Sequence, residues 1–469
     1  MDIYVGGRFI KTAQELIVRN PFNGTIVATT WLVGIPEFDL AVKAAQAARL
    51  PMQNLPAYKR YEALMHIRKR LTERRDEFSQ TIMMESGKPI RYALGEVDRS
   101  IQTFTVAAEE SKRIPREYIS LDWTPAGEKK EGLIRYFPAG IVAGIAPFNF
   151  PLNLAVHKIA PAIAAGCPVI LKPSSTTPLS TLLLAEIIDE TDLPKGAVSI
   201  LPMDRETGNI LVTDPRFALL SFTGSPEVGW KMKAAAGKKK VVLELGGNAG
   251  LIVTKSADIS DALAKCIVGA FSYSGQVCIH TQRILVHHEL FDEFSNRFSA
   301  MVQNLKIGDP ELPETEISSM IDEANAIRVE NWINEALQAG AKLICGGKRE
   351  GTMVSPTVLT NTTDSMRVCS EEVFGPVVSL ESYDNFANAL SQLNNTRFGL
   401  QAGIFTNEIS EMNLAFETLE VGGVIINDTP TFRVDHMPYG GVKDSGLGRE
   451  GVKYAMMDML EARILVKGI

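Results

Sequence analysis

The sequence predicts an α/β fold with mostly parallel sheets, and two observations support this class. Short apolar runs at 139–145, 169–171 and 198–201 alternate with helical stretches at 152–165 and near 178–190. Strands that alternate with helices imply right-handed crossovers between parallel strands, and ligands of such sheets bind at the carboxyl ends of the strands. In addition, a chain of 469 residues exceeds what one hydrophobic core usually holds, so we expect two large lobes and a smaller element.

The region before these runs is predicted to be helical. Residues 58–86 carry Leu64, Ile67 and Leu71 at helical spacing among many charged side chains, and Gly87 supplies a stop signal. We therefore expect one amphipathic surface helix over 58–86.

A second α/β region is expected after Gly247. Strand-like runs at 217–222 and 241–245 complete the first region, and in the second an apolar stripe predicts a helix over 289–305 that ends before Gly308. The stripe consists of Leu290, Phe294, Phe298, Met301 and Leu305.

Two segments stand outside this alternation. Residues 113–136 are polar without a strong period, and residues 462–467 are typical of a lone strand. A lone terminal strand needs a hydrogen-bonding partner, and another subunit is a candidate to supply it.

Composition narrows the classes of function. A net charge of −7 with interspersed basic residues offers no broad basic surface, so no nucleic-acid partner is expected. The start lacks a signal-peptide pattern and no run approaches the roughly 20 apolar residues of a membrane span, so we expect a cytoplasmic protein with no membrane partner. The five cysteines show no CxxC spacing and the six histidines form no HxxxH pair, so neither disulfides nor a metal site is expected.

A cysteine, a glutamate and an asparagine lie in segments that suit chemistry. In Ser274-Gly-Gln-Val-Cys278, a glycine permits close backbone approach beside the cysteine, although an arbitrary cysteine is more often a small buried hydrophobic residue. In Val241-Val-Leu-Glu244-Leu-Gly-Gly247, an apolar strand carries one carboxyl group, whose pKa burial would raise toward that of a general base. The alternative is a strand-end glutamate that faces solvent.

The asparagine lies between two prolines, in Ala146-Pro-Phe-Asn149-Phe-Pro-Leu152. Its amide can donate to a developing oxyanion, and a backbone N–H next to the nucleophile would complete the hole. A lone asparagine in such a segment is otherwise a turn residue.

Two further segments suit a nucleotide. Lys172 ends an apolar strand, where a ligand edge is expected, although a strand-end lysine can simply be solvated. Ser225, Pro226 and Glu227 suit the first positions of a helix, whose N-terminus also accepts phosphate.

A third segment has the pattern of a dinucleotide site but not its context. Gly446-Leu-Gly448-Arg-Glu-Gly451 matches the GxGxxG fingerprint, but no apolar strand precedes it, so we interpret it as a loop that leads into a helix.

With these motifs in order, the whole chain resembles the aldehyde dehydrogenase family, and in particular its branches that oxidise lactaldehyde, semialdehydes and, without phosphorylation, glyceraldehyde phosphate. The resemblance implies that Cys278 is the nucleophile, that Glu244 activates the hydrolytic water, and that Asn149 and the Cys278 backbone N–H form the oxyanion hole. It also implies hydride transfer to NAD or NADP and a thioester intermediate.

The resemblance further implies a division of the chain and a set of cofactor contacts. An NAD(P)-binding domain would comprise 1–112 and 137–246, a catalytic domain 247–440, and a β oligomerisation element 113–136 and 455–469, which would join copies into a homodimer or homotetramer. The expected cofactor contacts are Ala146, Pro147, Phe148, Lys172, Ser175, Gly208, Phe222, Gly224, Ser225, Val228, Leu245, Glu372 and Phe374.

Two departures from the commonest family pattern bear on the cofactor. Phe148 stands where many relatives have tryptophan and keeps an aromatic wall. Ser175 stands where NAD-preferring relatives often have a glutamate that repels a 2′-phosphate. The missing repulsion lets NADP bind but creates no preference, so both NAD and NADP remain candidates.

The substrate is expected to be a small hydroxylated or anionic aldehyde. His157, Arg433 and His436 are the candidate polar contacts, and the alternative for each is a structural polar group paired inside the protein.

Three other functions fit these motifs less well. A cysteine hydrolase would want a histidine base, which has no motif support. A dehydrogenase that forms acyl-CoA is closer, but a deacylating base at Glu244 argues against it. A non-enzymatic protein on this scaffold would have lost chemical residues, and none of the motif residues is missing.

Overall fold

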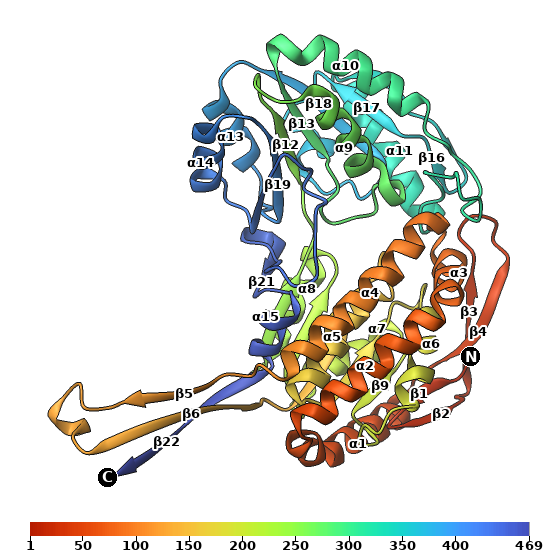
Figure 1. Cartoon of the computed structure of the whole chain (residues 1–469). Helices are drawn as coiled ribbons and strands as arrows, with labels where there is room; N and C mark the ends of the chain where they lie inside the picture. The colour runs from red at the N-terminus through yellow and green to blue at the C-terminus, as the bar shows by residue number, and fades with distance from the viewer. Residues whose placement is uncertain (469) are drawn as a thin grey trace.

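The computed structural model describes residues 1–468, which form two lobes and a projecting arm (Figure 1). The apolar runs of the first lobe build an eight-stranded sheet whose five central strands are parallel. Their buried, β-branched side chains suit a sheet that is covered on both faces. In spatial order the strands are β2 (Arg8–Ile10), β1 (Ile3–Val5), β9 (Val198–Ile200), β8 (Val169–Lys172), β7 (Ile141–Ile145), β10 (Phe217–Thr223), β11 (Lys240–Glu244) and β21 (Gly446–Leu447).

Helices cover this sheet. All residues of α5 are buried, because the helix is apolar apart from Asn153, His157 and Lys158. It ends at Gly166, whose φ of 83° gives the left-handed cap that favours glycine. The helices of this lobe are α1 (Ile35–Asn54), α2 (Ala57–Glu73), α3 (Arg75–Ser86), α4 (Ile90–Ser111), α5 (Asn153–Ala165), α6 (Leu179–Asp189), α7 (Arg205–Thr213), α8 (Pro226–Ala235) and α15 (Val452–Asp458).

The prediction of one helix over 58–86 is wrong, because the segment forms α2 and α3. The break falls at Arg74, whose φ of −104° and ψ of 19° are not helical. The Arg74 guanidinium binds Glu77 in α3 and Glu186 in α6, so side-chain pairing accompanies a bend that the apolar spacing does not reveal.

The second lobe is built around a seven-stranded sheet, which is parallel except for its first strand. Its strands, in spatial order, are β14 (Lys342–Cys345), β17 (Thr357–Thr360), β18 (Val377–Tyr383), β13 (Arg283–His287), β12 (Gly250–Val253), β19 (Gln401–Phe405) and β20 (Gly423–Ile426). Its helices are α9 (Ile259–Phe271), α10 (His288–Gln303), α11 (Glu323–Gln338), α12 (Arg367–Ser370), α13 (Phe386–Asn394) and α14 (Ile409–Thr418). The α10 helix lies where the apolar stripe predicts it, although Met301 is exposed.

The arm is a three-stranded antiparallel sheet of β5 (Arg116–Ser120), β6 (Lys130–Pro138) and β22 (Leu460–Gly468) (Figure 1). The β22 strand pairs with β6 of the same chain along its full length, from Leu460 opposite Pro138 to Gly468 opposite Lys130. The lone strand expected at 462–467 therefore has its hydrogen-bonding partner in its own chain, and the candidate partner from another subunit is not needed for this pairing.

Smaller elements complete the described residues. They are β3 (Gln14–Arg19), β4 (Ile26–Leu32), β15 (Arg349–Glu350), β16 (Met353–Val354), η1 (Pro125–Gly127), η2 (Ser272–Gly275) and η3 (Lys443–Ser445). No helix within residues 1–468 combines the length and the apolar character needed to cross a membrane.

After β20 the chain returns to the first lobe, where β21 adds an antiparallel edge to β11. The GxGxxG segment thus contributes only Gly446 and Leu447 to the sheet and leads into α15, as interpreted from the sequence. Because this return passes along the end of β11, it brings the loop 427–446 to the cleft between the two lobes.

Candidate active site

A cleft of about 830 Å³ is lined by both lobes. The first lobe contributes the loop after β7 and the ends of β10 and β11, which are the carboxyl ends of parallel strands. The second lobe contributes the segment after α9, and the returning loop contributes Arg433 and Tyr439. Cys278, Glu244 and Asn149 all line this cleft although they are far apart in sequence.

A tight backbone turn positions Cys278. Tyr273 and Ser274 have φ values of 50° and 53°, a strained region for residues with a side chain. At Gly275, φ is 69° and an added Cβ would lie 2.1 Å from the Gly375 carbonyl oxygen, so the close approach requires glycine. An added Cβ at Gly247 would lie 2.4 Å from the Cys278 carbonyl oxygen, so the turn after β11 packs directly against the cysteine.

The thiol of Cys278 is partly buried, and the other four cysteines are fully buried. Its Sγ lies 3.1 Å from the Tyr439 hydroxyl. Burial raises the pKa of the Cys278 thiol to about 11, while the hydrogen bond from Tyr439 works in the opposite direction. A thiolate at this position would therefore need stabilisation from its surroundings.

The carboxyl group of Glu244 lies at the end of β11 and neither oxygen has a hydrogen-bond partner among the described residues. Burial raises its pKa well above the ordinary range, and the charge of Glu450 adds to this effect. The sequence pattern predicts this raised pKa. An unpaired buried carboxyl group that lines a cleft can take up a proton from a molecule bound there.

Asn149 follows β7 and is buried, and its Nδ2 donates to the carbonyl oxygen of Gln276 at 3.0 Å. This bond ties the loop after β7 to the segment that carries Cys278. One hydrogen of the Asn149 side-chain amide is thereby bonded, and the other can donate to a group in the cleft.

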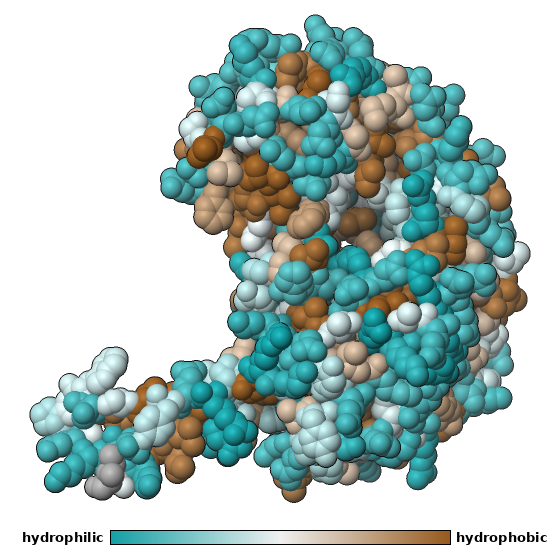
Figure 2. Space-filling model, viewed as in Figure 1, coloured by the Kyte–Doolittle hydropathy of each residue, from teal (hydrophilic) through white to brown (hydrophobic). Residues whose placement is uncertain are grey.

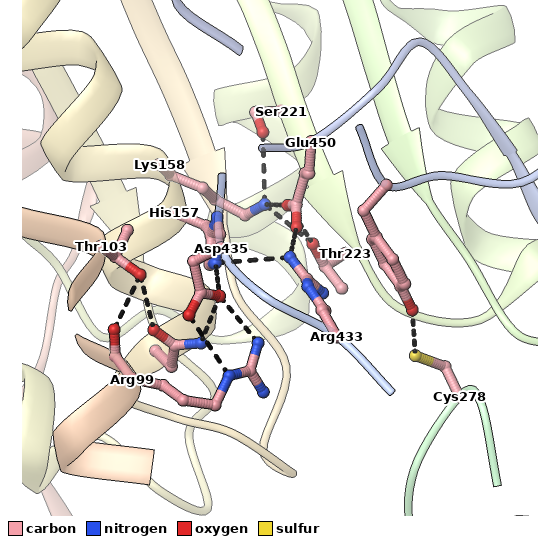
Figure 3. Close-up of polar contacts among 12 residues, drawn as sticks. Arg99, Thr103, His157, Lys158, Ser221, Thr223, Cys278, Arg433, Asp435 and Glu450 are labelled. Atoms are coloured by element: carbon pink, nitrogen blue, oxygen red, sulfur yellow. Dashed lines mark hydrogen bonds and ion pairs between the residues drawn. The ribbon is translucent and has the colours of Figure 1, made fainter. Parts of the chain in front are cut away.

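Three buried charged groups, Lys158, Arg433 and Glu450, lie near enough to Glu244 to influence its pKa. Figure 3 shows how these three side chains meet. Lys158 and Arg433 bind the two oxygens of Glu450 at 3.4 and 2.9 Å. Burial alone would raise the pKa of Glu450, but these cations and His157 lower it to about 2. Lys158 also donates to Thr223 at 2.8 Å, which anchors α5 to β10.

Beside these groups, Asp435 joins the returning loop, on which it lies, to α4 and α5 (Figure 3). Its carboxylate lies 2.8 Å from His157 Nε2 and 2.8 Å from an Arg99 nitrogen. Despite burial, His157 and Arg99 hold the pKa of Asp435 well below its usual range. Arg99 reaches the cleft from α4, whereas His157 is fully buried and does not line it.

The other side of the cleft carries Glu372 and Phe374. The Phe148 and Phe374 rings meet edge to face at 5.8 Å. Glu372 accepts a hydrogen bond from the Gly247 N–H at 3.1 Å, and burial raises its pKa to about 8. An added Cβ at Gly246 would lie 2.2 Å from a Glu372 oxygen, so the Gly-Gly turn lets the carboxyl group approach the backbone.

The helix α8 begins at the cleft with Ser225 as its N-cap, and Pro226 and Glu227 follow as the sequence predicts. The Ser225 side chain makes no capping bond, so the first amides of the helix stay available to an anion.

The predicted cofactor contacts divide into two groups. Those that line the cleft are Pro147, Phe148, Gly224, Ser225, Leu245, Glu372 and Phe374. Those that lie outside its lining are Ala146, Lys172, Ser175, Gly208, Phe222 and Val228. In this second group, an added Cβ at Gly208, which lies in α7, would be 3.1 Å from Lys172 Cε. Ser175 donates to the carbonyl oxygen of Met203, just before α7, so Lys172 and Ser175 both lie close to this helix.

Of the predicted substrate contacts, Arg433 alone lines the cleft, and His436 is exposed outside the lining. Sequence reasoning missed Arg99, Lys158, Tyr439 and Glu450. Lys158 carried a signal, because it is a lysine inside an otherwise apolar helix and must have a partner. Arg99 carried none, because it resembles any charged residue on an amphipathic helix.

Comparisons with known proteins agree with this geometry. The model of the aldehyde dehydrogenase family matches residues 9–465. A 3-sulfolactaldehyde dehydrogenase from Priestia aryabhattai is 42% identical over 466 residues, which cover 99% of this chain and 97% of that protein. The crystal structure of aldehyde dehydrogenase 21 from Physcomitrella patens, in complex with the reaction product succinate, is similar with a TM-score of 0.98 and 47% identity, and covers 100% of this chain and 98% of that chain.

A glyceraldehyde-3-phosphate dehydrogenase, GapN, from Methanocaldococcus jannaschii, complexed with NADP, is similar with a TM-score of 0.94 and 38% identity, and covers 98% of this chain and 100% of that chain. A family match over almost the whole length, and relatives that span it, show that this chain belongs to the aldehyde dehydrogenase family.

Proposed function

We propose that this enzyme oxidises a small hydroxylated or anionic aldehyde to its acid with NAD or NADP, through a thioester on Cys278. The observation that carries the proposal is the convergence of Cys278, Glu244 and Asn149 on one cleft. A nucleophile, a base and an oxyanion donor around one bound carbonyl are the groups that this chemistry needs.

Cys278 acts first. Its thiolate attacks the aldehyde carbon and a C–S bond forms, while the carbonyl oxygen becomes an oxyanion that accepts a hydrogen bond from Asn149. A nicotinamide cofactor, when bound, accepts the hydride of this carbon. Cys278 then holds the acyl group as a thioester.

Glu244 acts second, because hydrolysis needs a base. Its carboxylate takes a proton from water, the oxygen adds to the thioester carbon, and the C–S bond breaks to release the acid and the Cys278 thiolate. The buried pair of Lys158 and Glu450 lies near Glu244, and the charge of Glu450 favours proton uptake there.

The residues of the cleft fit a dinucleotide. The free N-terminus of α8 suits its phosphates, and Glu372 beside the Gly-Gly turn suits a ribose hydroxyl. We assign the NAD(P) site to 1–112 and 137–246 and the catalytic domain to 247–440. Ser175 carries no negative charge toward a 2′-phosphate, so both cofactors should bind.

Arg99 is our candidate for recognition of an anionic substrate. Its side chain is 31% exposed and lines the cleft, while Asp435 holds two of its nitrogens at 2.8 and 3.4 Å. The guanidinium is thus fixed in place and keeps donors free for a carboxylate, sulfonate or phosphate. The three relatives above are named for, or bound to, molecules with such groups.

The chain should also assemble, as a homodimer or homotetramer, through 113–136 and 455–469. Figure 2 shows apolar surface on the arm, where Tyr118, Leu465 and Val466 are 64%, 64% and 50% exposed. Two edge strands of the arm, β5 and β22, are free to extend a sheet, which favours pairing with another copy. A cytoplasmic location stays a prediction.

The test is a panel of steady-state rates with NAD and with NADP. The substrates are a small carboxylated semialdehyde, a neutral hydroxyaldehyde and an apolar aldehyde of similar length. We expect reduced cofactor to form, with the highest kcat/KM for the anionic substrate. Ester hydrolysis without cofactor reduction would contradict the activity, and a preference for the apolar aldehyde would contradict the substrate class.

A further inference from the structure

The hydroxyl of Tyr439 is the only side-chain group within residues 1–468 that hydrogen-bonds to the Cys278 sulfur (Figure 3). The two atoms are 3.1 Å apart, and Tyr439 is only 2% exposed. Water therefore has little room to replace this contact. The tyrosine arrives from the returning loop, 161 residues after the cysteine, so the contact depends on the complete fold.

The surroundings of Cys278 otherwise oppose a thiolate. Burial is the largest effect, and the carboxyl groups of Glu372 and Glu244 add to it, because negative charges disfavour a second one nearby. Arg433 works in the opposite direction, but among the described residues it makes no hydrogen bond to the sulfur. A neutral donor at hydrogen-bond distance is therefore the direct means of stabilising the charged sulfur.

Arg433 acts on this donor through the ring. The centre of its guanidinium lies 3.7 Å from the Tyr439 ring centroid, a close cation–π contact. Glu450 holds Arg433 in this position at 2.9 Å. A positive charge over the ring face draws electron density from the phenol oxygen and makes its O–H a stronger donor.

The direction of the hydrogen bond follows from proton affinity. Burial raises the pKa of Tyr439 well above its ordinary value, and the neighbouring Cys278 raises it further. The hydroxyl therefore keeps its proton while the thiol loses its own, and the thiolate can only accept.

We propose that Tyr439 is a further catalytic residue, whose hydroxyl donates a hydrogen bond to the Cys278 thiolate and keeps the nucleophile charged. This inference rests on the proposed role of Cys278 as the nucleophile. In this mechanism Asn149 donates a hydrogen bond to the substrate oxygen, whereas Tyr439 donates one to the sulfur.

The test measures the thiol without turnover. Iodoacetamide alkylates a thiolate, forming an S–C bond and releasing iodide, so the rate of Cys278 modification against pH gives the thiol pKa. Peptide mass spectrometry assigns the modification to Cys278, which is the least buried of the five cysteines. For Tyr439→Phe we expect a thiol pKa higher by about one pH unit, hence alkylation about tenfold slower below both pKa values and equal rates above them.

Matched variants separate this role from a structural one. Tyr383→Phe removes another buried tyrosine hydroxyl, which donates to the Val253 carbonyl oxygen at 3.4 Å, and should leave the Cys278 titration unchanged. Site-specific replacement of Tyr439 by 3-fluorotyrosine makes the phenol a stronger donor and should lower the thiol pKa, an effect in the opposite direction that loss of packing would not produce.

An unchanged or lower thiol pKa in Tyr439→Phe would overturn the inference, as would a higher one in the fluorotyrosine protein. The result is separable from the proposed activity, because alkylation requires neither aldehyde nor cofactor. Even in a protein that fails to reduce NAD(P), the alkylation rates show whether Tyr439 affects the pKa of the Cys278 thiol.

Discussion

At the scale of single residues, Cys278 is the nucleophile that we propose for the covalent intermediate. We expect Cys278→Ala to abolish aldehyde oxidation, because no other cysteine is accessible to replace it. Cofactor affinity should remain within about threefold, since the proposed nucleotide contacts lie on other residues. Absorbance of the reduced cofactor measures the first effect, and a fluorescence titration with NADPH the second. Residual oxidation near the wild-type rate would show that the thiol is not the nucleophile.

Glu244 should control hydrolysis of the thioester. Its pKa is raised by burial and by Glu450, and only the ionised form above that pKa can accept a proton from water. The kcat of the wild type should therefore fall as the pH drops through this raised pKa, at a pH well above that of an ordinary carboxylate. In Glu244→Gln, kcat should fall about 10²- to 10⁴-fold and lose this acidic limb, while a burst of reduced cofactor persists. A Glu244→Gln profile that keeps the limb would assign it to another group.

Arg99 should distinguish substrates by charge. In Arg99→Gln we expect kcat/KM for an anionic aldehyde to fall about 10- to 100-fold, the effect of one charge-assisted hydrogen bond, and kcat/KM for a neutral aldehyde to change little. The ratio between the two substrates is the measurement. Arg91, which also lines the cleft, binds Glu316 and supplies a matched control in Arg91→Gln. Equal losses on both substrates would assign Arg99 a structural role.

At the scale of elements, the turn before Cys278 is held by backbone contact. Gly275→Ala adds a Cβ only 2.1 Å from the Gly375 carbonyl oxygen at a φ of 69°, so the backbone must shift and the nucleophile with it. We expect a loss of about 2 kcal/mol or more in unfolding free energy and a strong loss of kcat. Gly237→Ala is the matched control, because φ is 66° but no atom lies within 4 Å of the added Cβ, so only the smaller cost of about 1 kcal/mol applies. Chemical denaturation and steady-state rates measure both effects, and equal losses would contradict this view of the turn.

Local sequence patterns predicted the elements whose apolar period is strong. The parallel strands β7, β8 and β10 and the helices α5 and α10 lie within a few residues of the predicted ranges. The segment 113–136 has no such period, because β5 is exposed on both faces and β6 is half-buried along most of its length, so neither strand has one apolar buried face. The break at Arg74 was not predicted for a related reason, because one of the ion pairs that accompany it joins Arg74 to Glu186, which is distant in the sequence.

In the site, too, local motifs predict some residues and not others. Cys278, Glu244 and Asn149 lie in short motifs that can be recognised in the sequence, and the structure brings them to one cleft. The roles proposed for Tyr439 and Arg99 depend on contacts with residues distant in sequence, Cys278 and Asp435, so no local pattern marks them.

At the scale of the whole molecule, the arm should connect copies. Leu465 lies on β22 and is 64% exposed, so a charge there would oppose burial in an interface without disturbing the core. We expect the wild type to sediment as a dimer or tetramer and Leu465→Arg as a smaller species with an unchanged circular dichroism spectrum. Analytical ultracentrifugation makes the comparison. A Leu465→Arg protein that keeps the wild-type assembly would place the interface elsewhere.

The two lobes matter because neither holds the complete site. Glu244 and Asn149, the proposed base and oxyanion donor, come from the first lobe, and Cys278, the proposed nucleophile, comes from the second. The proposed catalysis therefore requires that the lobes keep their relative position. In this mechanism all three groups act at the carbon of the thioester.

The most direct measurement is therefore mass spectrometry of the acyl-enzyme, trapped in Glu244→Gln by acid quench after mixing with a small anionic aldehyde and NADP. If the thioester forms on Cys278, we expect an acyl mass on the peptide that contains Cys278, no such mass without NADP, and none in the Cys278→Ala protein. An acyl group on another residue, or oxidation of the aldehyde at the wild-type rate with no covalent species on Cys278, would contradict it.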